Sequence, residues 1–249
     1  MEALKVESLS KDFGGLHAVR NVSFSVAEGE RLAIIGPNGA GKTTLFNLLN
    51  GQLTPTAGRV YFFGQDITRM TVFHRVHLGI ARSFQVTSLF LNLSVMQNML
   101  LALQGMRPSR YQMFNSYTSY EDVLARAKGL LVSMGLLEKR SERVKDIAHG
   151  EQRKIEIALS LASEPKLLLL DEPSCGLTAV ESTDIISRIR NLGKEITVIV
   201  VAHDMDLIFG VAERIIVLHY GEIIAEGTCD EIRCDLKVKE IYMGSEERK

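Results

Sequence analysis

The chain has 249 residues, of which 46% are hydrophobic and 24% are charged, and its formal net charge is −1. This is the composition of an ordinary globular protein with enough core for one large domain, and the near-zero charge excludes the basic surface typical of nucleic-acid binders. The three cysteines, Cys175, Cys229 and Cys234, form no pairing framework and indicate reduced thiols in a cytosolic protein.

The N-terminal part of the chain is predicted to form strands. Residues 4–9 and 22–26 alternate polar and apolar side chains, as half-buried strands do. Residues 1–10 lack the pattern of a signal peptide. No apolar run approaches the ~20 residues that a membrane span needs. If the protein acts at a membrane, we therefore expect it to do so from the membrane surface, through partner proteins.

A glycine-rich loop follows a short apolar strand predicted over residues 31–35 and fits G-x-x-x-x-G-K-[ST], the P-loop that holds a nucleoside triphosphate. The predicted ATP-binding residues of this loop are Gly36, Pro37, Asn38, Gly39, Ala40, Gly41, Lys42, Thr43 and Thr44. The glycines let backbone N–H groups converge on anionic oxygens, Lys42 adds a charge for the outer phosphates, and Thr43 offers a hydroxyl to Mg²⁺. A helix predicted over residues 44–50 adds a favourable field for phosphate. The alternative, a chance glycine-rich turn, does not account for the strand–loop–helix order, although kinases, GTPases, helicases and transporters all share this motif.

The middle of the chain changes from strands to helices. Strands are expected over residues 59–63 and 80–84, and a short helix over 72–78. Ser94 can cap a helix that begins at Val95. A polar loop over 105–120 and a helix over 121–134 follow, so residues 89–145 are predicted to form a mostly helical insert.

The second half alternates helices and strands. A helix is predicted over residues 150–162, strands over 167–170 and 196–201, and a hairpin over 215–225 that turns at Tyr220-Gly221. This order predicts an α/β fold, a P-loop NTPase core whose mainly parallel sheet is flanked by helices, with an N-terminal antiparallel β portion and the helical insert. We expect a single domain over residues 1–249, with a C-terminal tail over about 226–249.

Two acids at the end of a buried strand are the second strong signal. Four leucines lead directly into Asp171 and Glu172, and ligands of open parallel sheets bind beyond the carboxyl ends of the strands. Asp171 is expected to reach Mg²⁺, directly or through water. Glu172 is placed to orient and polarise the attacking water. The alternative is a helix-capping Asp beside a surface Glu, which the upstream P-loop disfavours.

Three further side chains carry weaker signals when each is taken alone. His203 follows the next apolar strand and could contact the γ-phosphate, although a single histidine there is more often structural. Gln85 could coordinate Mg²⁺ or water through its amide oxygen, or be an ordinary surface amide. Phe13 could stack on adenine, or be a core aromatic.

The segment 147–153, followed by a predicted helix, is the third signal. Taken with the P-loop, Gln85, Asp171-Glu172 and His203 in this order, it resembles the ATP-binding subunits of ABC-type systems over nearly the whole chain. The resemblance implies that Ala148, His149, Gly150 and Glu151 form a signature loop that closes over ATP held by the P-loop of a second subunit. It also makes the functional interpretation of His203, Gln85 and Phe13 the favoured one.

This signature departs from the family's general L-S-G-G-Q. Ala148 occupies the serine position, so the resemblance implies that one hydroxyl contact to the γ-phosphate is absent, and we expect this to weaken closure by ~1 kcal/mol. Thr178 occupies the position of the family's aspartate in the loop after the acidic pair. These changes favour, as a hypothesis, a heterodimer with a different ATPase over a homodimer.

The branch is indicated by residues 81–85, 148–157 and 175–177 and by the tail at 231–244, which look like those of the branched-chain amino-acid importer ATPases. The resemblance implies an ATPase using ATP and Mg²⁺, peripheral on the cytoplasmic face of the inner membrane, with a second ATP-binding subunit and membrane-spanning permease subunits as partners. Other ABC systems, for urea or amide import or lipopolysaccharide export, remain open. So do soluble ABC ATPases of cluster assembly, ribosome control or DNA repair, while a P-loop small-molecule kinase would leave the signature helix and His203 unexplained.

Overall fold

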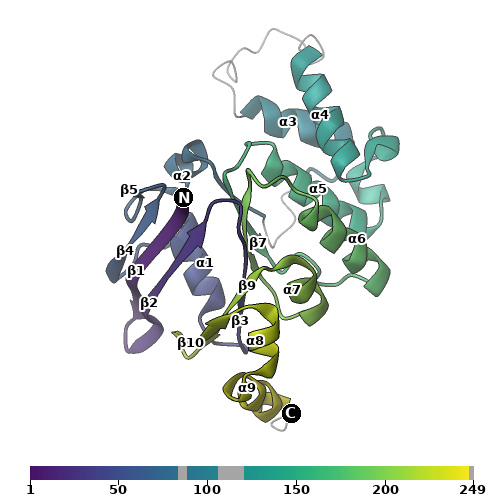
Figure 1. Cartoon of the computed structure of the whole chain (residues 1–249). Helices are drawn as coiled ribbons and strands as arrows, with labels where there is room; N and C mark the ends of the chain where they lie inside the picture. Colours follow the sequence, from purple (N-terminus) through teal and green to yellow (C-terminus); the bar gives the residue numbers. More distant parts are fainter. Residues whose placement is uncertain (84–88, 106–120, 247–249) are drawn as a thin grey trace.

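A computed structural model of the chain describes residues 1–83, 89–105 and 121–246. Two β-sheets lie side by side, and helices cover the larger of them on both faces (Figure 1). The α/β class predicted from the sequence is confirmed.

The smaller sheet is antiparallel and holds four strands in the order β2-β1-β4-β5. Its strands are β1 (Glu2–Phe13), β2 (Leu16–Ala27), β4 (Ala57–Phe62) and β5 (Gln65–Asp66). The first two extend well beyond the alternating segments at 4–9 and 22–26. Alternation detects only the stretch that packs on the core, since Val6 and Leu9 are buried whereas Phe13 and Leu16 at the hairpin are exposed.

The larger sheet holds six strands in the order β10-β9-β3-β8-β7-β6. Five of them are parallel, and only β10 runs antiparallel, as the partner of β9. The strands are β3 (Arg31–Ile35), β6 (Ile80–Arg82), β7 (Leu167–Asp171), β8 (Thr197–Val201), β9 (Arg214–His219) and β10 (Glu222–Gly227). Strands β3, β7 and β8 are buried at every position, which explains why the sequence shows them as continuous apolar runs.

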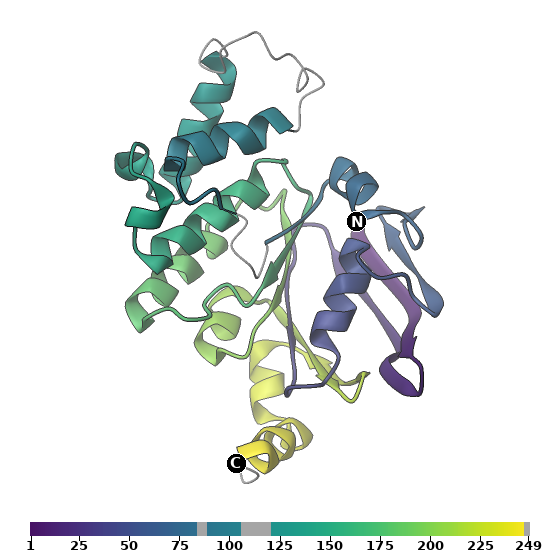
Figure 2. The same ribbon diagram turned by 180° about the vertical axis from the view of Figure 1, so that it is seen from behind.

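Alternate residues of the central strands face two different cores. Leu32 and Ile34 pack with α1 (Lys42–Asn50) and the smaller sheet, whereas Ala33 and Ile35 pack with the helices of the opposite face. Those helices are α3 (Val95–Gly105), α4 (Glu121–Ser133), α5 (His149–Leu161), α6 (Ala179–Arg190) and α7 (Met205–Val211). Figures 1 and 2 show α1 on one side of the sheet and α5 on the other.

The predicted helices at Val95 and Glu121 are confirmed as α3 and α4, which extend to one side of the sheet (Figure 2). Ser94 caps α3 as expected, because its Oγ accepts from the Gln97 N–H at 3.1 Å. Two short 3₁₀ turns, Leu137–Lys139 and Val144–Asp146, lead from α4 toward α5. Most of the loop predicted over 105–120 lies outside the described residues.

The remaining helices are short or terminal. Helix α2 (Val72–Leu78) has the predicted bounds, and α8 (Cys229–Cys234) and α9 (Leu236–Glu246) form the C-terminal tail. The strand predicted over 80–84 is seen as β6, which ends at Arg82; Ser83 is described and lies outside the strand, and residue 84 is not among the described residues. Among the described helices, none combines the length and apolar character that crossing a membrane requires.

Candidate active site

The P-loop connects β3 to α1 and borders a cavity of about 390 Å³. Helix α1 begins at Lys42, and Gly41 before it has φ +101°. A Cβ atom on Gly41 would lie 2.3 Å from the carbonyl oxygen of Ala18, so no other residue fits here without displacing β2. Because β2 approaches the predicted P-loop so closely, position 41 of the loop has to be glycine.

Lys42 lies largely buried beneath the loop, with 9% of its surface exposed. Its Nζ donates to the carbonyls of Gly36 at 2.6 Å and Pro37 at 3.1 Å. Burial lowers the pKa of Lys42 from its ordinary value, while the nearby carboxylates of Glu172 and Asp171 oppose that shift. A phosphate group placed beside Lys42 would supply the anionic partner that burial of an ammonium requires.

Asp171 ends β7 and is 1% exposed. Its Oδ2 accepts from Arg82 Nη2 at 2.6 Å, and its Oδ1 is buried with no hydrogen-bond partner among the described residues. A buried carboxylate oxygen without a partner is costly, and a hard cation or its water would satisfy it. The donor set of this carboxylate and the Thr43 hydroxyl therefore fits Mg²⁺, which takes few protein oxygens and keeps water.

Glu172 follows Asp171 with φ +47°, in the left-handed region that non-glycine residues seldom adopt. Its N–H donates to the carbonyl of Val201 at 2.8 Å, and this bond holds the turn out of β7. The carboxylate of Glu172 contacts Nδ1 of His203 at 2.8 to 2.9 Å. The strained turn thus brings together the acid and the histidine that end two neighbouring parallel strands, at the edge that the sequence predicted.

Arg153 on α5 supports this turn from behind. It donates to the carbonyl of Glu172 at 2.6 Å and to that of Pro173 at 3.3 Å, and it forms an ion pair with Glu156 at 2.6 Å. The sequence reasoning did not assign Arg153 a role. The sequence offered one signal for a role of Arg153, because this residue lies in the predicted signature segment, where the helix that packs behind β7 begins.

The cavity brings together most of the P-loop with Glu172. Described residues that line it are Leu16, His17, Ala18, Arg20, Asn38, Gly39, Ala40, Gly41, Lys42, Thr43, Thr44, Glu172, Val201 and Tyr220. Of the predicted residues, Gly36, Pro37, Asp171 and His203 do not line it, although Asp171 and His203 neighbour residues that do. Phe13 is also outside the lining and 46% exposed, with Lys11 Nζ 5.2 Å from its ring centre. Gln85 lies outside the described residues.

Six lining residues were missed in the sequence. Leu16, His17, Ala18 and Arg20 come from β2, Val201 ends β8, and Tyr220 comes from the turn between β9 and β10. The strand order offered a signal for Tyr220, because β9 is the parallel neighbour of β3 and ends at the same edge as the P-loop.

The predicted signature residues lie at the start of α5, on the opposite face of the sheet from α1 (Figure 1). Glu151 accepts from Lys139 Nζ at 2.7 Å and from the Ala148 N–H at 3.3 Å. The carboxylate of Glu181 accepts from the Gly150 backbone. None of the four residues lines the P-loop cavity, so a contact with nucleotide would have to be made with nucleotide held elsewhere.

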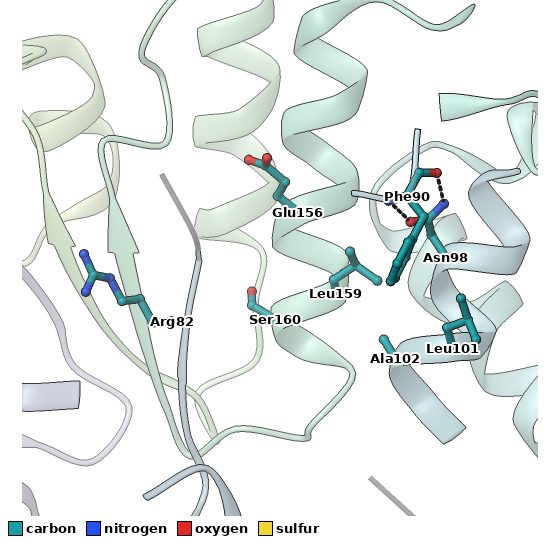
Figure 3. A pocket seen from close by; sticks show the side chains of 8 residues that line it. All are labelled: Arg82, Phe90, Asn98, Leu101, Ala102, Glu156, Leu159 and Ser160. Atoms are coloured by element: carbon teal, nitrogen blue, oxygen red, sulfur yellow. Dashed lines mark hydrogen bonds between the residues drawn. The ribbon is translucent and has the colours of Figure 1, made fainter. Parts of the chain in front are cut away.

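A second cavity, of about 470 Å³, lies between β6, α3 and α5 (Figure 3). Phe90, Leu101, Ala102 and Leu159 give it an apolar wall, and Glu156 and Ser160 add polar atoms. Asn98 fixes the Phe90 backbone through two hydrogen bonds, at 2.9 and 3.1 Å. Phe90 and Leu101 are nevertheless 60% and 45% exposed, so this cavity, the α3–α5 groove, presents large apolar side chains to solvent.

Comparison with known proteins places the chain among ATP-binding cassettes. Residues 19–175 match the family described as ABC transporter. The chain is 35% identical over 249 residues to the high-affinity branched-chain amino acid transport ATP-binding protein LivG of Escherichia coli, with 97% of each protein covered.

Solved structures agree with this. The crystal structure of the ADP conformation of an ATP-binding cassette of an ABC transporter superposes with a TM-score of 0.86 at 32% identity, covering 98% of this chain and 99% of the other. A dimeric ATP-binding cassette in a post-hydrolysis state bound to ADP and Pi has a TM-score of 0.75 at 27% identity, covering 90% and 98%. The chain belongs to the ABC transporter family, as one of its ATP-binding subunits.

Proposed function

We propose that this chain hydrolyses ATP to energise the import of branched-chain or other hydrophobic amino acids. The observation that carries the chemical part is the placement of Glu172 on the wall of the P-loop cavity, held by a strained turn and a contact with His203. The solute is inferred from the relatives named as branched-chain amino acid transport ATP-binding proteins.

The proposal gives the P-loop and three further side chains distinct tasks. Backbone N–H groups of the loop and the start of α1 bind the phosphates, and Lys42 turns from its own loop carbonyls to the outer phosphate oxygens. Glu172 orients and polarises the attacking water, and His203 steadies the γ-phosphate while its contact with Glu172 keeps that carboxylate aimed. Phe13, exposed at the end of β1, is proposed to stack on adenine.

Thr43 and Asp171 are the residues proposed to hold Mg²⁺, with Gln85 as a third. The ion, when bound, neutralises charge on the outer phosphates. Asp171 suits this task because one of its oxygens is buried and unpaired among the described residues. Thr43 follows Lys42 on the first turn of α1, next to the loop that binds the phosphates.

A second ATP-binding subunit is proposed to complete each site. Ala148, His149, Gly150 and Glu151 would contact ATP held by the partner's P-loop, through N–H groups at the start of α5. Support comes from their position across the sheet from this chain's own P-loop and from the dimeric cassette among the structural relatives. ATP would then favour the closed pair because it contacts both subunits only in that state.

The α3–α5 groove is the proposed contact with a membrane-spanning permease subunit. Its exposed Phe90 and Leu101 would be covered by an apolar helix of that subunit. The groove is well placed for coupling, because Glu156 at its wall pairs with Arg153, which holds the Glu172 turn. Association with the membrane, on its cytoplasmic face, would be indirect and through this contact.

Hydrolysis is tested with Glu172→Gln. The amide keeps the size of the side chain but cannot polarise water as a carboxylate does, so ATP should bind normally and turn over at least about 100-fold more slowly. Glu7→Gln, an exposed change on β1, is the matched control and should leave turnover unchanged. Near-normal turnover in Glu172→Gln would remove Glu172 from the mechanism.

The solute is tested in cells. Deletion of the gene should abolish most high-affinity uptake of radiolabelled leucine, isoleucine and valine, and the wild-type gene, but not its Glu172→Gln form, should restore it. Unchanged uptake of all three would contradict the amino-acid assignment, and restoration by Glu172→Gln would contradict its dependence on hydrolysis.

A further inference from the structure

Arg82, the last residue of β6, connects three parts of the candidate site that are distant in sequence. Its Nη2 donates to Asp171 Oδ2 at 2.6 Å, and its Nη1 donates to Asn47 Oδ1 at 2.6 Å and Gln52 Oε1 at 2.8 Å. Asn47 belongs to α1, the helix that the P-loop opens, and Gln52 follows the end of that helix. A single guanidinium thus ties the predicted Mg²⁺ ligand to the helix that carries the phosphate-binding loop.

This contact is buried and directional. The Arg82 and Asp171 side chains are only 11% and 1% exposed, so little water competes for their hydrogen bonds. One terminal nitrogen of the planar guanidinium donates to the carboxylate, and the other donates to the two amide oxygens. A lysine ammonium cannot reproduce this geometry. Ser83, the next residue, also accepts from the Asp171 N–H at 3.3 Å. Both the side chain and the backbone of Asp171 are therefore fixed from the end of β6.

The two oxygens of Asp171 consequently differ. Oδ2 is occupied by Arg82, whereas Oδ1 is buried with no partner among the described residues. The bond to Arg82 holds the plane of the carboxylate, so the pair leaves one defined oxygen free to accept from a further group.

We propose that Arg82 is a positioning residue for the metal-bound nucleotide, because it clamps Asp171 and the P-loop helix together and leaves Oδ1 of Asp171 as the oxygen offered to Mg²⁺ or its water. The inference rests on the proposed function, in which Asp171 serves Mg²⁺. Arg82 touches neither the metal nor the phosphates in this role. Its effect appears in how much Mg²⁺ strengthens ATP binding, rather than in ATP binding itself.

The test uses the full chain carrying Glu172→Gln, so that ATP is not consumed. The affinity for ATP is measured by calorimetry with Mg²⁺ and again with EDTA, and the ratio of the two affinities is the readout. Mn²⁺ bound to the chain–ATP complex is measured in parallel by electron paramagnetic resonance. Arg82→Met should reduce the ratio about tenfold, the effect of losing one charge-assisted hydrogen bond, and leave the EDTA affinity within about twofold.

Matched variants separate positioning from general damage. Arg31→Met removes another buried arginine from the same sheet, one that binds the carbonyls of Arg190 and Leu192 at the opposite end of the strands. It should leave the affinity ratio unchanged whatever its cost in stability. If Arg82→Met does not fold, Arg82→Lys serves instead, and should also reduce the ratio because its single ammonium cannot hold Asp171 and both amides.

Asp171→Asn tells the two claims apart. If Asp171→Asn lowers the ratio of ATP affinities with Mg²⁺ and with EDTA, while Arg82→Met and Arg82→Lys leave this ratio unchanged, the inference is overturned and the proposed role of Asp171 stands. An unchanged affinity ratio in Asp171→Asn would overturn both the positioning role of Arg82 and the proposed role of Asp171. The expected result is a reduced affinity ratio and weaker Mn²⁺ binding in Arg82→Met, with neither effect in Arg31→Met.

Discussion

Replacement of Arg75 by methionine should be among the most damaging single changes outside the nucleotide cavity. Arg75 on α2 is 1% exposed and donates to five carbonyls. Two of them, Leu48 and Leu49, are in the last turn of α1, at 2.8 and 2.6 Å. The other three lie between β5 and α2, at Ile67, Thr68 and Met70. Burial lowers the pKa of Arg75 to about 10, so the guanidinium remains charged at neutral pH.

The expected cost follows from these contacts. Each buried carbonyl that loses its partner costs about 1–3 kcal/mol, and water admitted to the smaller methionine site recovers part of the sum. We therefore expect Arg75→Met to lower the free energy of unfolding by about 3–5 kcal/mol, in the range measured for breaking buried charged networks. For a chain of this length that corresponds to a fall in melting temperature of roughly 10 °C.

Urea unfolding followed by circular dichroism measures this cost. Arg59→Met changes an exposed arginine whose guanidinium donates to Tyr61 Oη at 3.4 Å; this variant is the control and should change stability by less than about 0.5 kcal/mol. A loss below about 1 kcal/mol in Arg75→Met would refute the view that Arg75 supports the end of the P-loop helix, because leaving even one buried carbonyl unpaired costs about that much.

Three further predictions concern the P-loop. Lys42→Ala should lose most ATP binding in a nucleotide titration, and unchanged affinity would refute its role as the phosphate cation. Because burial lowers the pKa of Lys42, its charge is lost at lower pH than that of an exposed lysine. ATP affinity should therefore fall before the pH reaches 10.5, the ordinary value, and an affinity that stays flat to that pH would contradict this. Gly41→Ala should abolish ATP binding, since its Cβ would lie 2.3 Å from Ala18 O. Gly64→Ala, with φ +78° and open space around it, carries the backbone strain without a clash and should bind ATP normally. Normal ATP binding by Gly41→Ala would refute the role of the clash.

Much of the fold could be predicted because its signals are local. The fully buried strands β3, β7 and β8 are continuous apolar runs, and α2 has the bounds that its spacing indicated. Asp171 and Glu172 could be assigned to the site because a parallel sheet places the ends of its strands at one edge.

Arginines that join distant segments could not be predicted in the same way. Arg75, Arg82 and Arg153 bind backbone or side-chain atoms brought close only by the packing of α1, α2 and α5 around the sheet. Arg82 is a partial exception, since its register opposite Leu169 on β7 follows once the strand order is known. Sequence periodicity predicts which faces are buried, but not which buried polar atoms meet.

The central claim, that this ATPase works with a membrane transporter, is tested most directly by purifying the tagged chain from gently solubilised native membranes and identifying its partners by mass spectrometry. The account predicts membrane-spanning subunits together with a second ATP-binding subunit, and their loss when Phe90 in the α3–α5 groove is changed to Asp. Recovery of the chain with soluble proteins alone, from membranes in which the transporter subunits are present, would contradict it and leave only the ATPase chemistry.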